Sequence, residues 1–175
     1  MNLPCELPLL TSDAGLEQAK PTELRRVCLV VLGGESFAID LRQVREVFEL
    51  ESMTPVPGMP ASLVGVANLR GTIIPLADLR QSLGVSLSTA ARYVIVVRHD
   101  SHQIGLLIDG VPEIREIATE DMLSDSEATI TSIKGGHRFL SGLVRVENRV
   151  SGMLVIPSLL ASVEDAVMEP SLSET

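Results

Sequence analysis

Two histidines three positions apart are the first candidates for chemistry in this chain. His99 and His102 have the spacing of half a metal site, and a small metal-dependent hydrolase is the enzyme class that such a site would serve. Neither a cysteine nor a further histidine cluster lies nearby to complete the ligand set, and His137 is distant in sequence. We therefore expect a polar hairpin tip at 99–102, with no metal and no cofactor.

Other catalytic signatures are absent from the sequence. Ser141-Gly142 does not belong to a GxSxG nucleophile motif, and no glycine-rich loop has the form that cradles phosphate. Cys5 lies in a polar tail and Cys28 in an apolar run, so we interpret both as reduced thiols rather than a disulfide. The expectation is a protein without catalytic residues, not an enzyme.

Charge and composition exclude further classes. The net charge is −9 and aromatic residues make up 2% of the chain, which is the opposite of a basic, aromatic nucleic-acid binder. The longest apolar run, Val27–Leu32, is far shorter than the ~20 residues of a membrane span. The first ten residues contain no Lys or Arg, so no signal peptide is predicted. We expect a cytoplasmic protein without direct membrane insertion.

Short apolar runs separated by turn residues predict a chain made mainly of strands. Gly33-Gly34 permits a tight turn, because glycine adopts positive φ without steric cost. We expect strands at Val27–Leu32, Ser36–Ile39, Leu63–Leu69, Thr72–Leu76, Tyr93–Val97, Ile104–Ile108, Glu113–Ile117, Phe139–Val146 and Ser151–Ile156.

Three short helices are also predicted. The first follows Asp40, a helix-capping residue with Gln43 three positions on, and has apolar residues at helical spacing. These apolar residues are Leu41, Val44, Val47 and Phe48. Asp78 is expected to cap a second helix that runs through Leu83 and stops at Gly84. Ser158 is expected to open a final amphipathic helix.

A weak internal repeat predicts two similar halves. A shift of 66 places Arg26 on Arg92, a shift of 67 places 44–47 on 111–114, and a shift of 82 places 73–75 on 155–157. Five short strands close most economically into a small barrel. We expect a flexible arm at 1–24, one domain at 25–168 and a flexible tail at 169–175. Within the domain we expect barrels at about 37–92 and 93–156, sharing strand 27–32 and helix 158–168.

The segment VGVANLRGTIIPLADLR at 64–80 resembles the central signature of the CheW family. The segments 37–50, 103–117 and 139–160 resemble further parts of that family in the same order. The resemblance implies a mainly all-β fold of two SH3-like five-stranded barrels. It also implies a non-enzymatic adaptor that couples methyl-accepting chemotaxis receptors to a CheA-type histidine kinase, or an adaptor of a twitching-motility or surface-sensing pathway.

Partners and site residues follow from the same resemblance. The expected partners are the similarly folded regulatory domain of the kinase and the helical cytoplasmic tip of the receptors. The protein is expected to be monomeric when free, and these contacts would recruit it to membrane-receptor arrays. The protein-binding residues implied by position in the motifs are Arg70, Val44, Gly65, Asn68, Gly71 and Val111.

For some of these residues the sequence leaves two interpretations open. Asn68 and Gly71 are expected to hold the turn that presents Arg70, whose planar guanidinium suits an interface. Gly65 either marks a strand bulge or admits a receptor helix close to the backbone. Val44 belongs to an apolar stripe that is usually core, and its exposure is expected on family grounds alone.

Overall fold

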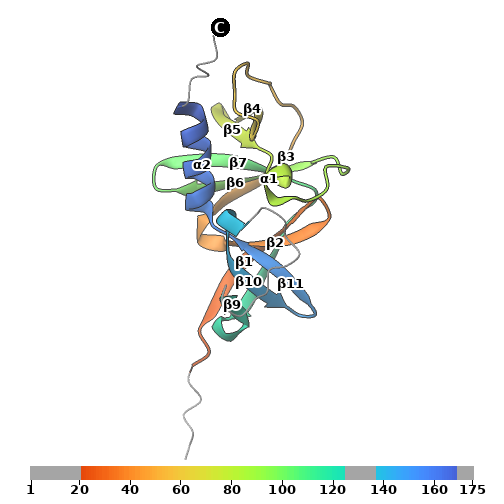
Figure 1. Cartoon of the computed structure of the whole chain (residues 1–175), viewed down its shortest axis with the longest axis vertical. Helices are drawn as coiled ribbons and strands as arrows, with labels where there is room; N and C mark the ends of the chain where they lie inside the picture. The colour runs from red at the N-terminus through yellow and green to blue at the C-terminus, as the bar shows by residue number, and fades with distance from the viewer. Residues whose placement is uncertain (1–20, 125–136, 169–175) are drawn as a thin grey trace, which may run out of the picture.

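The computed structural model describes residues 21–124 and 137–168, so Cys5 and almost all of the predicted arm and tail lie outside the described residues (Figure 1). The strands are β1 Leu24–Leu32, β2 Glu35–Asp40, β3 Val44–Glu49, β4 Leu63–Leu69, β5 Thr72–Ala77, β6 Tyr93–His99, β7 His102–Ile108, β8 Glu113–Ala118, β9 Met122–Ser124, β10 Leu140–Val146 and β11 Arg149–Leu154. The helices are α1 Arg80–Leu83 and α2 Ile156–Met168, and 3-10 turns occupy Leu41–Gln43, Thr119–Asp121 and His137–Phe139.

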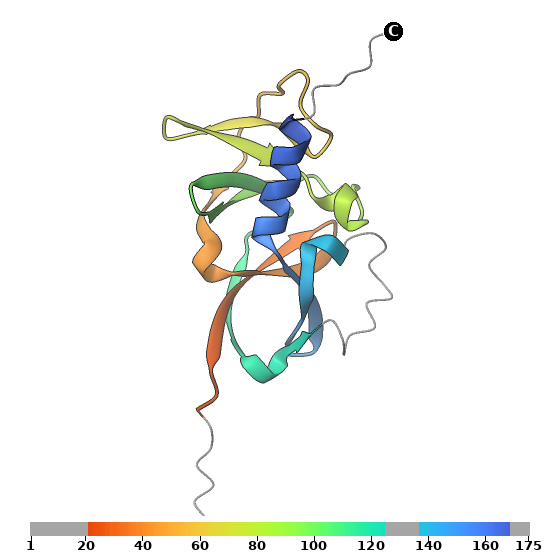
Figure 2. The same ribbon diagram turned by 60° about the vertical axis from the view of Figure 1, so that its left-hand side comes forward.

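The strands form two sheets that lie one above the other (Figures 1 and 2). One sheet has the order β3-β6-β7-β5-β4, and the other has the order β8-β1-β2-β11-β10-β9. Each is antiparallel except for one parallel pair, β5 with β7 and β11 with β2. The mainly all-β prediction is confirmed, and the two sheets are SH3-like barrels. We call β3–β7 the first barrel and the remaining strands the second barrel.

The predicted division of the barrels near residue 92 is wrong. The hairpin β6–β7 lies in the middle of the first barrel's sheet, and the hairpin β1–β2 occupies the matching place in the second. The chain therefore starts in the second barrel, builds the whole first barrel, and then returns. The strand at 27–32 pairs within the second barrel rather than being shared. Local sequence patterns do not reveal which distant strands will pair, which is why the division was missed.

Strand pairing confirms one of the three proposed repeat shifts. In the first barrel Val47 pairs with Ile95, and in the second barrel Ile114 pairs with Cys28. Ile114 lies 67 positions after Val47, and Ile95 lies 67 positions after Cys28. The β1–β2 hairpin matches β6–β7 by 67 rather than 66 positions, since Cys28 faces Ile39 as Ile95 faces Leu106. The hairpins β4–β5 and β10–β11 correspond by 77 positions, not 82, because Leu63↔Ala77 and Leu140↔Leu154 begin the two ladders.

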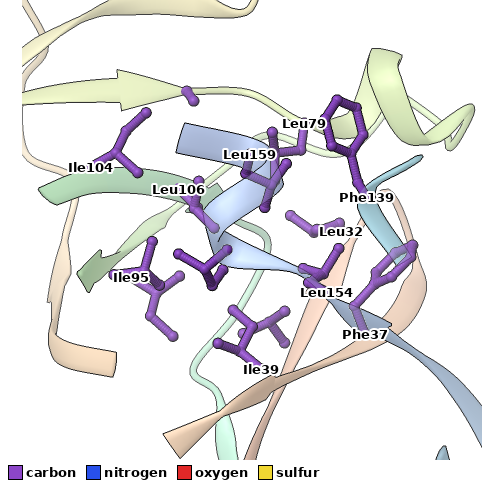
Figure 3. Packing of buried hydrophobic residues seen from close by; sticks show 14 of the residues in the cluster. Leu32, Phe37, Ile39, Leu79, Ile95, Ile104, Leu106, Phe139, Leu154 and Leu159 are labelled. Carbon is purple, nitrogen blue, oxygen red and sulfur yellow. The ribbon is translucent and has the colours of Figure 1, made fainter. Parts of the chain in front are cut away.

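Three clusters of buried hydrophobic residues form the core of the molecule: one inside each barrel and one between the barrels. One fills the first barrel around Ile74 and Leu76, and a smaller one fills the second barrel around Val27 and Val144. The largest lies between the barrels, where β1–β2 and β6–β7 face each other and α2 adds Leu159. Figure 3 shows side chains from both barrels and from α2 meeting in this shared core. Its size makes the two barrels one folding unit rather than two loosely linked ones.

The predicted helix over 41–48 is wrong, although its cap is right. The Asp40 carboxylate accepts a hydrogen bond from Arg42 N at 2.9 Å, but only a 3-10 turn follows before the chain enters β3. A register shift in β3 lies between Val44 and Glu46. This bulge lets Val44 and Val47 both pack against the shared core, whereas strict alternation would place them on opposite faces. The bulge therefore gives the apolar residues of this strand the spacing expected of a helix.

The other two helices occur close to their predicted places. The Asp78 carboxylate accepts from Arg80 N at 3.1 Å, and α1 ends at Gly84, which has φ 69°. Helix α2 begins at Ile156, two residues earlier than the predicted Ser158. Pro157 does not prevent this, because a proline in the first turn removes an N–H that has no partner within the helix.

Candidate partner-binding surface

Arg70 stands at the corner of the β4–β5 hairpin in an unusual backbone conformation. Leu69 pairs with Thr72, so Arg70 and Gly71 are the two turn residues, with φ 51° and 87°. A turn with two positive φ angles fits the twist of a hairpin, but a side chain at such a φ costs about 1 kcal/mol. The Asn68 carboxamide oxygen accepts a hydrogen bond from Gly71 N at 2.8 Å and closes the turn.

The Arg70 side chain leaves the corner without a strong partner in its own barrel. Its side chain is 84% exposed, and Nη1 lies 3.6 Å from Glu46 Oε2 on β3. An exposed pair at that distance contributes little stability. Ile73, three residues along the chain, is 60% exposed. We call Glu46, Arg70 and Ile73 the first corner: a lightly held cation beside an exposed apolar side chain.

Gly65 is buried and lies against the chain's own connector. A Cβ atom at this position would lie 2.5 Å from Thr54 O and 2.9 Å from Met53 Cγ. Thr54 and Val66 exchange two backbone hydrogen bonds of 2.9 Å beside it, and the β4–β5 ladder shifts register between Leu63 and Gly65. Of the two interpretations of Gly65, the bulge is present, and the segment that lies close to its backbone in this structure is the chain's own 53–54.

The remaining predicted residues lie on different barrels. Val44 is half-buried on β3 and packs against the shared core. Val111 precedes β8 and is 68% exposed. The shift of 67 that relates β3 to β8 places Val111 at the position of Val44. The predicted residues therefore do not form one site. Asn68, Arg70 and Gly71 lie together in the β4–β5 turn, Val44 and Gly65 lie elsewhere in the first barrel, and Val111 lies in the second barrel.

Sequence reasoning missed Glu147, which occupies the second barrel's version of the Arg70 corner. Glu147 has φ 55° in the β10–β11 turn, and its Oε1 lies 3.5 Å from Arg115 Nη1 on β8. Arg115 also donates to Glu113 Oε2 at 2.8 Å. We call Val111, Glu113, Arg115 and Glu147 the second corner. The turn was predicted, but the wrong repeat shift hid its correspondence with Arg70.

The second corner borders a hollow in the second barrel. The hollow has a volume of about 290 Å³. Its lining residues are Leu29, Val31, Gly34, Ser36, Val111, Glu113, Arg115, Val146, Glu147, Arg149 and Ser151. By the shifts of 67 and 77, Arg115 and Ser151 replace Phe48 and Ile74 of the first barrel, both of which pack in its core. Two large apolar side chains are thus exchanged for polar ones, which leaves the second barrel open at this end.

The histidine pair lies at the tip of the β6–β7 hairpin. His99 pairs with His102, and His99 Nε2 is 3.5 Å from Asp100 Oδ2 in the turn. Within the described ranges, no group of three or more His, Cys, Asp or Glu side chains is placed to hold a metal ion. The described part of the chain also contains no helix that is both long and apolar enough to span a membrane.

Comparison with known proteins agrees with this geometry. The family described as the CheW-like domain matches residues 26–164. The chain is 30% identical to the chemotaxis protein CheW of Rhizobium meliloti, over 76% of this chain and 85% of that protein. It is also 30% identical to the chemotaxis protein CheW of Klebsiella aerogenes, over 81% and 84%.

A solved structure and a shorter match complete the comparison. The crystal structure of the scaffolding protein TtCheW from Thermoanaerobacter tengcongensis superposes with a TM-score of 0.66 at 25% identity, over 76% of this chain and 90% of that one. Protein PilI of Pseudomonas aeruginosa is 38% identical over 46% of each chain. The order of the motifs, the paired barrels and these matches agree: the chain belongs to the CheW-like domain family.

Proposed function

We propose that this protein is a non-enzymatic adaptor that couples methyl-accepting chemotaxis receptors to a CheA-type histidine kinase. The observation that carries the proposal is the state of Arg70, which is held at φ 51° with an 84% exposed side chain and whose one ion pair within the described residues is the 3.6 Å contact to Glu46. A strained, exposed and lightly paired arginine contributes little to its own fold. Such a residue is best explained by a partner surface that it contacts.

The kinase regulatory domain is the partner that the two corners suit best. A domain of similar two-barrel fold would present its own pair of corners. The first corner carries the cation Arg70, whereas the second carries the anion Glu147 beside a hollow with both polar and apolar lining residues. Opposite corners of two such domains are complementary in charge, and contact between unlike surfaces builds rings or larger assemblies. Each contact would combine a charge pair at the rim with an apolar side chain in the hollow.

The receptor tip needs a surface that leaves the corners free. Leu24 and Ile114 are 59% and 61% exposed. They lie on one face of the β1–β8 pair, because Leu24 is opposite Ala118 and Cys28 is opposite Ile114. A helical hairpin can lay an apolar stripe along such a face. Receptor contact there would bring a cytoplasmic adaptor, monomeric when free, to membrane-receptor arrays while both corners bind kinase.

The proposal is tested by titrating the purified protein against the kinase regulatory domain and a receptor cytoplasmic tip from the same genome. Arg70→Ala is expected to lose about tenfold or more in affinity for one partner, as truncation of an interface arginine often does. Arg42→Ala is the control for kinase binding, since Arg42 is 80% exposed, is bound to Asp40 and belongs to neither corner. Failure of the native protein to bind either partner at several hundred micromolar would overturn the proposal.

The same titration separates the chemotaxis pathway from another pathway with the same components. Receptor tips from a chemotaxis pathway and from a twitching-motility or surface-sensing pathway are compared side by side. Preference for the second tip would keep the adaptor function and change the pathway that it serves.

A further inference from the structure

The chain contains the tripeptide Asp-Leu-Arg twice, with the same hydrogen bonds in both copies. In the first, Arg42 Nε and Nη2 donate to Asp40 at 3.0 and 2.7 Å. In the second, Arg80 Nε and Nη2 donate to Asp78 at 2.9 and 2.6 Å. The surroundings differ, because the side chain of Arg42 is 80% exposed and that of Arg80 is 9% exposed. Only the second copy is buried.

Arg80 contacts two further groups that Arg42 lacks. Its Nη1 donates to the backbone oxygen of Thr89, which ties down the segment after α1. The same Nη1 lies 4.0 Å from Oδ1 of Asp109, whose side chain is also 9% exposed. That Asp109 oxygen is buried and has no hydrogen-bond partner among the residues that the structure describes. Arg80 is therefore the cation that compensates a second buried carboxylate, and removing it would leave two anions together.

Asp109 connects this cluster to the other barrel. It directly follows β7 of the first barrel, and its backbone N donates to Val31 O on β1 of the second barrel at 2.9 Å. Its Oδ2 accepts from Gly34 N in the β1–β2 turn at 3.1 Å. The neighbouring Gly33 packs closely against the first barrel, since a Cβ atom there would lie 2.3 Å from Ser86 O. The cluster thus sits where the barrels touch.

Asp78 and Arg80 hold each other in their charged forms. Burial alone would raise the pKa of Asp78, but the side-chain and backbone hydrogen bonds and the charge of Arg80 together hold that pKa below its usual value. The hydrogen bonds to Asp78 raise the pKa of Arg80 in turn, against the effect of its burial. Ionised groups in fixed contact give the junction an orientation that apolar packing alone does not impose.

We propose that Arg80 and Asp109 are positioning residues that fix the orientation of the two barrels relative to each other, and so hold the first and second corners at a set geometry. The shared core keeps the barrels attached, and the Asp78–Arg80–Asp109 cluster selects one arrangement among those that the core permits. The inference rests on the proposed function only for its consequence, that assemblies using both corners depend on this cluster. Binding through a single corner does not.

Pulsed electron resonance on the free protein tests the positioning role. Spin labels are placed at Ser101→Cys in the first barrel and Asn148→Cys in the second, both exposed turn positions. Cys5→Ser removes one native thiol, and Cys28 is shielded at 2% exposure. We expect one narrow distance distribution for the native protein and for the control Arg42→Gln. Arg80→Gln is expected to broaden and shift that distribution.

A rescue variant separates charge from packing. In Arg80→Gln the carboxylates of Asp78 and Asp109 are left without their shared cation, whereas adding Asp109→Asn removes one charge and keeps an acceptor for Gly34 N. We expect the double variant to recover much of the narrow distribution. A distribution for Arg80→Gln as narrow as the native one would overturn the inference, whatever happens to stability. If Arg80→Gln fails to fold, Asp109→Ala, which removes the acceptor for Gly34 N as well as the charge, is compared with the native protein and must itself shift the distribution.

Assembly supplies the functional readout. Pairwise affinity of Arg80→Gln for the kinase regulatory domain is expected to stay within twofold of native, while the yield of extended receptor–kinase assemblies falls severalfold. If the native protein binds no partner, the proposed function fails and the distance measurement still decides the positioning role. If Arg80→Gln assembles as well as the native protein and Arg42→Gln, the inferred dependence of assembly on this cluster is overturned, while the distance measurement decides the positioning role.

Discussion

Arg70 and Glu147 occupy corresponding corners of the two barrels with opposite charges. They lie 77 positions apart in matching hairpins and have nearly equal φ angles of 51° and 55°. Each lies near an oppositely charged residue on another strand of its own barrel: Arg70 is 3.6 Å from Glu46 on β3, and Glu147 is 3.5 Å from Arg115 on β8. A positive φ is what such a two-residue hairpin turn requires, so the two corners present side chains of opposite charge from the same backbone geometry.

Replacing Arg70 by glycine should separate stability from binding. Glycine accepts the positive φ that arginine tolerates poorly, so Arg70→Gly is expected to raise the free energy of unfolding by up to about 1 kcal/mol. The same change should weaken partner binding as much as Arg70→Ala does. Urea unfolding and calorimetric titration measure the two effects. A clear loss of stability in both variants would instead make Arg70 a structural residue.

Reversing the charge of Glu147 should weaken the contact with the kinase regulatory domain and alter its salt dependence. Glu147→Arg brings a cation against Arg115 and against the cationic corner of the partner, so association should slow at low ionic strength. Glu120→Arg changes the net charge equally on an exposed turn elsewhere in the second barrel. Stopped-flow association rates at two salt concentrations are the measurement, and equal rates for the two variants would contradict the assignment.

Two adjacent isoleucines should differ sharply in their effect on stability. Ile74 is 2% exposed and fills the first barrel, whereas Ile73 is 60% exposed at the first corner. We expect Ile74→Ala to cost about 2–5 kcal/mol of unfolding free energy, and Ile73→Ala less than about 0.5 kcal/mol. Ile74→Asp should prevent folding, because it buries a charge. Denaturant midpoints test this. Similar losses of unfolding free energy in both alanine variants would contradict the assignment of Ile74 to the core and Ile73 to the surface.

Acid should destabilise the protein through its two Asp-Leu-Arg pairs. The hydrogen bonds from Arg42 hold the pKa of Asp40 below 3.8. Burial would raise the pKa of Asp78, but the contacts with Arg80 outweigh burial and lower that pKa as well. Because these folded-state pKa values are depressed, their stabilisation is present above about pH 4 and is lost as the pH falls through the folded values. The unfolding free energy, measured from pH 7 to 3, should fall less steeply in Asp78→Asn than in the native protein. A native curve that stays flat to pH 3 would contradict both assignments.

A methyl group at Gly65 should release the connector that crosses it. The added Cβ of Gly65→Ala would meet Thr54 O at 2.5 Å, so the backbone bonds between Thr54 and Val66 are expected to break. Limited proteolysis should then cut the connector near Met53 much faster. At Gly34 no atom lies within 4 Å of such a Cβ, so Gly34→Ala controls for the strain of positive φ without the clash. Equal cleavage rates would mean that the connector tolerates the methyl group.

The sequence alone determined the features that depend on neighbours along the chain. The NLRG motif identified the corner, because Asn68 and Gly71 are what a tight turn at Arg70 requires. Alternating apolar runs located most of the strands, and Gly84 predicted where α1 ends. These features arise from φ preferences and side-chain-to-backbone bonds within a few residues. They carry over unchanged into the folded molecule.

Only the tertiary structure decided which strands share a barrel and what each repeated motif contacts. The bulge in β3 gave a strand the apolar spacing of a helix. The two Asp-Leu-Arg copies are alike in sequence, yet the arginine side chain is 80% exposed in the first and 9% exposed in the second. The Glu147 corner became visible only once strand pairing had set the repeat register. Pairing and burial are decided by contacts between residues far apart in sequence, and those contacts leave no local pattern to read.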